Sequence, residues 1–166
     1  MLSNIFGLGA MISLFLLYQQ KNRKNILLCK LSADILWIAH YYCIGAAAGI
    51  IPNLTGVLRE LVFINRKAKK WANSPLWVVF FILLNFILGI ILSFKNWFDI
   101  IPIAASSLVT IALWLDNPNL TKTLSAPVSA SFLIYDIFVS SHMGVINESI
   151  SLISIMIYFL KHKEEK

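Results

Sequence analysis

The chain has 166 residues, of which 58% are hydrophobic and only 13% are charged, and its mean hydropathy is +0.77. A soluble domain keeps about a quarter of its residues charged, so this composition excludes an ordinary soluble fold. The net charge of +6 does not indicate a nucleic-acid partner, because the basic residues gather in short clusters between apolar runs, as they do where charge orients helices in a membrane.

Seven apolar runs predict seven transmembrane helices, because each is close to the roughly 20 residues that a helix needs to cross a bilayer. In chain order, the expected spans are 3–19, 26–45, 50–66, 76–94, 98–115, 121–141 and 144–161. Small residues at 45–49 and 140–144 separate the second span from the third and the sixth from the seventh. Such corners favour adjacent antiparallel helices.

The third span is the least certain of the seven, because four polar or charged side chains dilute it: Asn53, Thr55, Arg59 and Glu60. It could instead be an amphipathic helix that lies on the membrane surface. The distribution of charge favours a span. With seven spans and an outside N-terminus, the inner loops hold basic clusters at 21–24, 66–70 and 161–163, and Lys122 beside Asp116. The outer loops hold only Lys95, with Asp99 and Glu148 at helix ends.

The two halves of the chain show a weak internal repeat. A shift of 95 residues, with a one-residue gap near its end, superposes these pairs: His40 on Tyr135, Gly45 on Ser140, Gly49 on Gly144 and Asn53 on Asn147. Three helices reverse the chain direction, so two parallel three-helix units need one extra span between them, which 76–94 supplies. We therefore predict an all-α membrane protein of two parallel triple-helix bundles, 1–70 and 97–166, joined by a linker transmembrane helix at 71–96. The second bundle would end in a basic cytoplasmic tail.

This plan of three, one and three helices resembles that of the SWEET sugar transporters and the PnuC vitamin transporters. In the SWEET family, the resemblance implies a pocket at the bundle interface that is lined by asparagine and tryptophan side chains from both halves. Trp37, Asn53 and Asn147 are the positions here that could match.

A closer resemblance starts at the run KLSADILWIAHY at 30–41. It continues through Gly45, Gly49, Asn53, Gly56 and Arg59. These residues resemble the small bacterial inner-membrane proteins of the YgjV type. The resemblance implies a location in the bacterial inner membrane and little about function.

Ionisable residues inside a bilayer usually face a bundle interior or a cavity. Asp34 and Arg59 are expected near mid-depth of neighbouring antiparallel helices, where they could pair directly. Such a pair would fix how the helices dock, or would gate or couple transport. Asp136 is the acidic residue within a span of the second half that has no evident basic partner. It could line the outer mouth of a pathway and couple or gate transport, or cap the corner at the water boundary.

Polar residues recur along three helices at the spacing of a single helical face. The three stripes are Lys30, Asp34, Trp37 and Tyr41; Ser125, Ser129, Phe132 and Asp136; and Asn147, Ser151, Ser154 and Tyr158. Polar residues of this kind also hold membrane helices together without any transport role. Because the repeat places the stripes symmetrically, we prefer an interior that binds substrate. The predicted substrate-binding residues are Trp37, His40, Asn53, Tyr135, Asn147 and Ser151; His40 alone would also fit a hydrogen-bonded packing role.

Motifs of enzymes were sought and not found: the sequence has no Gly-rich phosphate loop, no H-E-x-x-H and no G-x-S-x-G. We expect no catalytic residue, no cofactor and no metal site. The predicted function is transport of a small polar solute, sugar-like or vitamin-like, between the two bundles. The alternative is a non-transporting inner-membrane scaffold or assembly protein. The expected partners are the lipid bilayer and the solute, and the sequence leaves homo-oligomerisation open.

Overall fold

The computed structural model describes residues 2–19, 23–115 and 118–164. Seven α-helices dominate this part of the chain: α1 (Leu2–Gln19), α2 (Arg23–Cys43), α3 (Ala47–Ile64), α4 (Leu76–Leu88), α5 (Ile100–Leu115), α6 (Pro118–Phe138) and α7 (His142–Glu164). Three short elements join them: η1 (Lys70–Asn73), η2 (Gly89–Ser93), which extends α4, and η3 (Trp97–Asp99). The predicted spans match these helices to within a few residues. Lys21 and Asp116, which were assigned to inner loops, lie outside the described residues.

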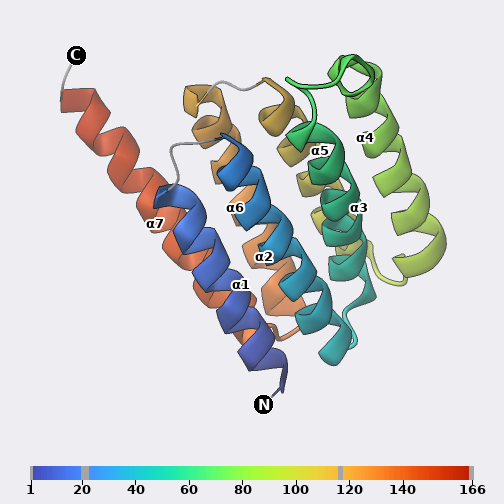
Figure 1. Ribbon diagram of the computed structural model, residues 1–166. Helices are drawn as coiled ribbons and strands as arrows, with labels where there is room; N and C mark the ends of the chain where they lie inside the picture. The colour runs from blue at the N-terminus through green and yellow to red at the C-terminus, as the bar shows by residue number, and fades with distance from the viewer. Residues whose placement is uncertain (1, 20–22, 116–117, 165–166) are drawn as a thin grey trace.

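The helices alternate in direction, so that the two ends of the chain lie at opposite ends of the molecule (Figure 1). We call the end where α1 begins the N-terminal face. It also holds the turn between α2 and α3 and the turn between α6 and α7. We call the opposite end, where α1, α3 and α5 finish, the C-terminal face.

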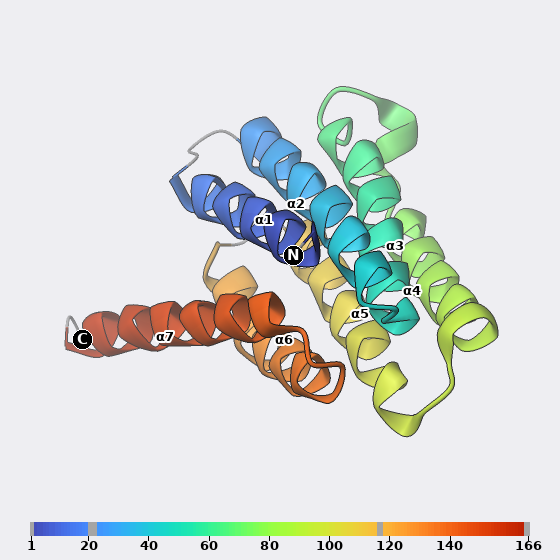
Figure 2. The same ribbon diagram turned by 90° about the horizontal axis from the view of Figure 1, so that it is seen from below.

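Six helices form a closed ring of contacts. α1, α2 and α3, called here the first unit, pack in sequence order, and so do α5, α6 and α7, called the second unit. Contacts between α3 and α5 and between α1 and α7 join the two units. α4 packs against α3 and α5 on the outside of the ring (Figure 2). Because α3 contacts α2, α4 and α5, it is a packed internal helix, and the alternative of a surface helix is not supported.

Polar and apolar side chains are distributed in the reverse of the pattern of a soluble protein. The most deeply buried side chains include Asp34, Arg59 and Glu60, at 2% exposure or less. Large apolar side chains face outward, such as Phe15 at 65% and Ile91 at 71%. An apolar exterior of this kind suits contact with lipid, where helices satisfy their own backbone hydrogen bonds.

Length and composition also fit membrane helices. Within the described residues, four helical segments are long and apolar enough to cross a bilayer: Lys24–Cys43, Ala47–Ile64, Leu76–Ser93 and Trp97–Leu115. α1, α6 and α7 contain shorter apolar stretches of 10–17 residues. The predicted count of seven spans therefore stays a prediction for these three helices.

The corner between α2 and α3 has the same backbone as the corner between α6 and α7. The second residue after α2 and the second residue after α6 are left-handed, with φ of 71° at Gly45 and 54° at Ser140. The amide of Ala46 donates to the Tyr41 carbonyl at 3.0 Å. Its counterpart 95 residues later, Ser141, donates to the Asp136 carbonyl at 2.9 Å. This is the Schellman ending, in which a left-handed residue closes a helix. The predicted repeat thus has a structural counterpart at this corner.

Candidate functional site

A cavity of about 210 Å³ lies inside the ring of six helices and is lined by residues of both units. The lining extends from Tyr41, near the end of α2 at the N-terminal face, to Leu17, near the end of α1 at the C-terminal face. All of its polar and aromatic side chains except Asn53 and Glu148 come from the three predicted stripes. The full set is Lys30, Trp37, Tyr41, Asn53, Ser125, Ser129, Phe132, Asn147, Glu148 and Ser151.

Four of the six predicted substrate-binding residues line this cavity: Trp37, Asn53, Asn147 and Ser151. They come from α2, α3 and α7, of which α3 and α7 follow the equivalent turns described above. The pairing of Asn53 with Asn147 across the repeat therefore brings one amide from each unit to the same space. These are the side chains best placed to bind a solute.

His40 and Tyr135 are not among the residues that line this cavity, so their role in binding substrate stays a prediction that the cavity does not support. The His40 ring is held at 2.8 Å from the Ser3 carbonyl oxygen and at 2.8 Å from the Ser141 hydroxyl. Tyr135 is fully buried in the apolar core beside the ring of Phe98.

The two units are joined at the N-terminal face by polar contacts between α2 and the end of α6. The Tyr41 hydroxyl donates to Asp136 Oδ1 at 2.7 Å, and His40 bonds to Ser141. Gly7 lets α1 approach α7 there, because a Cβ at this position would lie 2.5 Å from the Met143 Cβ. Asp136 is 1% exposed and is absent from the cavity lining. Asp136 ties the units together, because its carboxylate accepts from Tyr41 of the first unit and bonds to Ser141 in the corner of the second. Its role in gating or coupling stays a prediction.

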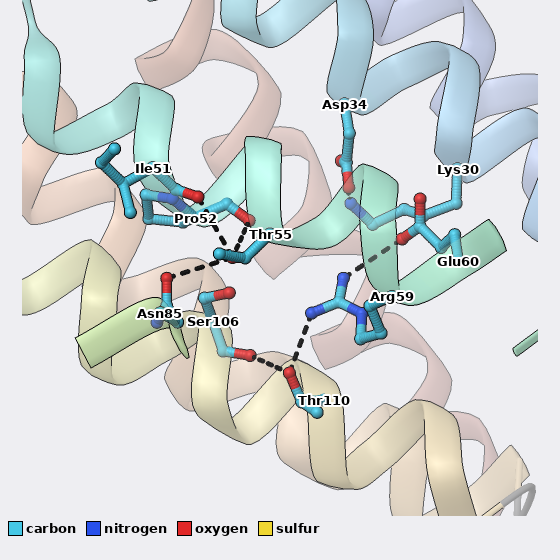
Figure 3. Close-up of polar contacts among 10 residues, drawn as sticks. All are labelled: Lys30, Asp34, Ile51, Pro52, Thr55, Arg59, Glu60, Asn85, Ser106 and Thr110. Atoms are coloured by element: carbon cyan, nitrogen blue, oxygen red, sulfur yellow. Dashed lines mark hydrogen bonds and ion pairs between the residues drawn. The ribbon is translucent and has the colours of Figure 1, made fainter. Parts of the chain in front are cut away.

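Four charged residues gather where α2 meets α3, beside a second cavity of about 30 Å³ that Lys30, Asp34 and Arg59 border (Figure 3). Lys30 forms an ion pair with Asp34, four residues along the same helix. Arg59 pairs with Glu60 at 3.1 Å and donates to the Thr110 hydroxyl of α5 at 2.9 Å.

The predicted direct pair between Asp34 and Arg59 is therefore wrong. Lys30 reaches Asp34 from one helical turn away, and the Arg59 guanidinium turns toward α5 instead. Both side chains still border the position of Gly56, where a Cβ would collide with the Asp34 carboxylate. Gly56 thus allows the charges of α2 and α3 to come together.

Further polar contacts join the first unit to α4 and α5. The Thr55 hydroxyl donates to Asn85 Oδ1 at 3.2 Å, and the Asn85 amide donates to the Ile103 carbonyl at 2.7 Å. Figure 3 shows that Thr55 of α3 points toward Asn85 of α4. Near the C-terminal face, the Arg66 guanidinium lies 3.8 Å above the ring centroid of Trp114. α3 is therefore tied to α5 at several levels.

The whole sequence, residues 1–166, matches the model of the Imp-YgjV family, described as "Bacterial inner membrane protein". The chain belongs to this family. Neither a curated protein nor a solved structure matches it. The resemblance carried by residues 30–59 is confirmed, and the protein is a protein of the bacterial inner membrane. The likeness to the SWEET and PnuC transporters and the orientation of the termini stay predictions.

One charged residue of the cavity lies elsewhere than its sequence context predicts. Glu148 was expected at an outer helix end, yet it lines the cavity beside Asn147, whose amide donates to Glu148 Oε1 at 2.8 Å. The stripe of Asn147 and Ser151 was the available signal, since Glu148 lies three residues before Ser151 on the same helix. Within the described part of the family member, no three His, Cys, Asp or Glu side chains are grouped as metal ligands would be.

Proposed function

We propose that the chain is a transporter that moves a small polar solute across the bacterial inner membrane through the cavity between its two units. The observation that carries this proposal is the cavity itself, which receives polar side chains from both units in a protein whose exterior is apolar. Transporters built from parallel repeats place their substrate site at the repeat interface. Trp37, Asn53, Asn147 and Ser151 would contact the solute.

The contacts around the cavity differ between the two faces. At the N-terminal face, hydrogen bonds from Tyr41 and His40 join the first unit to the second. Toward the C-terminal face, α7 diverges from α1 (Figures 1 and 2). This asymmetry supports alternating access, with the units forming two triple-helix bundles and α4 acting as their linker. Opening the N-terminal face would require the bond between Tyr41 and Asp136 to break, so we assign Asp136 to the gate.

The charged cluster has a different role in the proposal. Because Arg59 bonds α3 to Thr110 of α5 and the Asp34 carboxylate of α2 packs against Gly56 of α3, these contacts would make the first unit and α5 move as one body. The second unit's α6 and α7 would then rock against that body. The basic cluster at 66–70 belongs to the C-terminal face, so by the positive-inside rule this face would be cytoplasmic. The proposal gives no residue a catalytic role.

The test is the accessibility of the cavity to water from each face. A cysteine at Ser151, in a background with Cys29→Ala and Cys43→Ala, should react with a membrane-impermeant thiol reagent only from the C-terminal face. The control is a cysteine at Ser154, which lies three residues further along α7 on its exposed side and should meet lipid. That control cysteine should stay unreactive from either side.

Weakening the gate should change the pattern. In the Ser151→Cys protein, Asp136→Asn removes the charged acceptor of the Tyr41 hydroxyl, and charge-assisted hydrogen bonds are about twice as strong as neutral ones. Labelling should then become measurable from the N-terminal face as well. If Ser151→Cys reacts from neither face with the gate intact or weakened, the interior is sealed. A sealed interior would overturn the transport proposal in favour of the scaffold.

A further inference from the structure

Two charged side chains line the central cavity, Lys30 of α2 and Glu148 of α7. The charge of Lys30 is already balanced, because its ammonium group pairs with Asp34. Lys30, Asp34, Arg59 and Glu60 together carry two positive and two negative formal charges, so the cluster to which Lys30 belongs sums to zero.

Glu148 is different. Its carboxylate accepts from two neutral groups, the Asn147 amide and the Ser129 hydroxyl, and none of the ion pairs between described residues includes it. A carboxylate in a membrane interior is costly unless it is paired and hydrogen-bonded. Lys30 attracts Glu148 across the cavity but forms its ion pair with Asp34, so Glu148 has no salt-bridge partner of its own, which favours a positively charged occupant.

Aromatic rings lie on the wall of the same cavity. Trp37 and Tyr41 of α2 line it with their rings stacked at 5.8 Å between centroids, and Phe132 of α6 lines it from the second unit. The faces of aromatic rings attract cations. They attract organic ammonium groups in particular, whereas ions such as Ca²⁺ require about six to eight oxygen ligands.

We propose that the cavity binds a small organic cation, an amine or a quaternary ammonium ion, with its nitrogen between the Glu148 carboxylate and the ring of Trp37. This proposal rests on the transport function proposed above and narrows its class of solute. The cavity of about 210 Å³ is smaller than the usual range of about 300–1,000 Å³ for drug-sized ligands, which fits a small cation. An inside-negative membrane potential would drive such a solute toward the cytoplasm.

The test compares probes that differ only in charge. The full-length protein in detergent is titrated with choline and with its uncharged isostere, in which a tert-butyl group replaces the trimethylammonium group. A third probe, glycine betaine, keeps the cationic group and adds a carboxylate. Choline should raise the melting temperature, because a ligand that binds only the folded state stabilises it. Neither the isostere nor betaine should match choline at the same concentration.

Three variants locate the effect. Glu148→Gln keeps a side chain that can bond to Asn147 but removes the charge, and it should weaken choline binding at least about tenfold, or roughly 1.4 kcal/mol. Glu148→Asp keeps the charge and should still prefer choline to the isostere. Asp99→Asn removes a negative charge outside the cavity, at the turn before α5, and should leave binding unchanged. The melting temperature without ligand shows whether each variant folds.

Several results would overturn the proposal. The isostere could bind as well as choline, betaine alone could bind, or an inorganic cation alone could raise the melting temperature. Unchanged choline binding in Glu148→Gln would count against it equally. These results leave transport intact, provided that Ser151→Cys is still labelled from one face. A cavity that is sealed in the labelling test would instead overturn the transport function, and this inference with it.

Discussion

The α2–α3 pair and the α6–α7 pair share a backbone corner but differ in what surrounds it. α2 and α6 both have 21 residues, and a left-handed residue stands two positions after the end of each. After the corner, α3 packs against α4 and α5 in addition to α2, whereas α7 packs against α6 and, less extensively, α1. The same local fold therefore occupies a crowded position in the first unit and a more open one in the second.

Side chains follow this difference. Arg59 of α3 is 2% exposed, while its counterpart Ile153 of α7 is 53% exposed. Asp34 of α2 corresponds to Ser129 of α6 under the shift of 95 residues. The charged Arg59 therefore lies where α5 supplies a hydrogen-bond partner, and the apolar Ile153 lies where no such helix covers it. The comparison teaches that a repeat can conserve its corners while its helix faces diverge with their neighbours.

Breaking the charged cluster should have the largest effect. Arg59→Leu leaves Glu60 without its ion-pair partner and Thr110 without its donor, and removing one member of a buried pair typically costs about 3–5 kcal/mol. The free energy of unfolding in detergent measures the loss. The matched control at the counterpart position, Ile153→Leu, should change stability little. Replacing both Arg59 and Glu60 by leucine should recover much of the loss, and additive losses would contradict a paired cluster.

The second test adds one methyl group at each equivalent corner. A Cβ at Gly49 would lie 2.7 Å from the Tyr41 ring, and a Cβ at Gly144 would collide with the Asp136 carboxylate. Because both helices must shift, each Gly→Ala substitution should lower the free energy of unfolding by about 1–3 kcal/mol. Gly9→Ala is the control, since its Cβ would meet Leu36 at an ordinary 3.4 Å. A loss at one corner only would mean that the two corners are not equivalent.

A smaller effect should follow from exchanging the two left-handed residues. Gly45 tolerates φ of 71° freely, whereas Ser140 adopts φ of 54° against the preference of a residue with a Cβ. Left-handed backbone costs such a residue roughly 1–2 kcal/mol. Ser140→Gly should therefore stabilise the protein by about 1 kcal/mol, and Gly45→Ser should destabilise it by a similar amount. Changes of the same sign in both variants would contradict the shared Schellman geometry.

The sequence predicted the helices and the corners well because their signals are local. Apolar runs mark the helices, and the small residues at 45–49 and 140–144 mark corners at which the chain reverses. The superposition of Gly49 on Gly144 also held, since each glycine packs against the side chain eight residues before it. These features depend on a short stretch of chain and on little else.

The site was predicted less completely because its contacts depend on which helix lies opposite. Arg59 turns to Thr110 of α5, a helix that the sequence did not place beside α3. Asp34 pairs with Lys30 on its own helix because of a choice of side-chain conformation that no spacing rule decides. Glu148 was expected at a helix end because the sequence does not locate the start of α7 to better than a few residues. α7 begins at His142, which carries Glu148 into the cavity.

The last comparison concerns the sides of the membrane and should leave stability unchanged. Lys69 follows the first unit, and Lys163, its counterpart by the repeat, lies near the end of the second. If α4 crosses the membrane between the units, the two units are parallel and both positions lie on the cytoplasmic side, whereas Lys95 lies outside. Single cysteines at these positions, in a background without Cys29 and Cys43, should be labelled accordingly by an impermeant reagent in oriented vesicles. Labelling of positions 69 and 163 from opposite sides would mean that the units are inverted relative to each other. In two inverted units, the α2–α3 corner and the α6–α7 corner would lie on opposite sides of the membrane. The bond between Tyr41 and Asp136, which joins these corners at one face, could then not form.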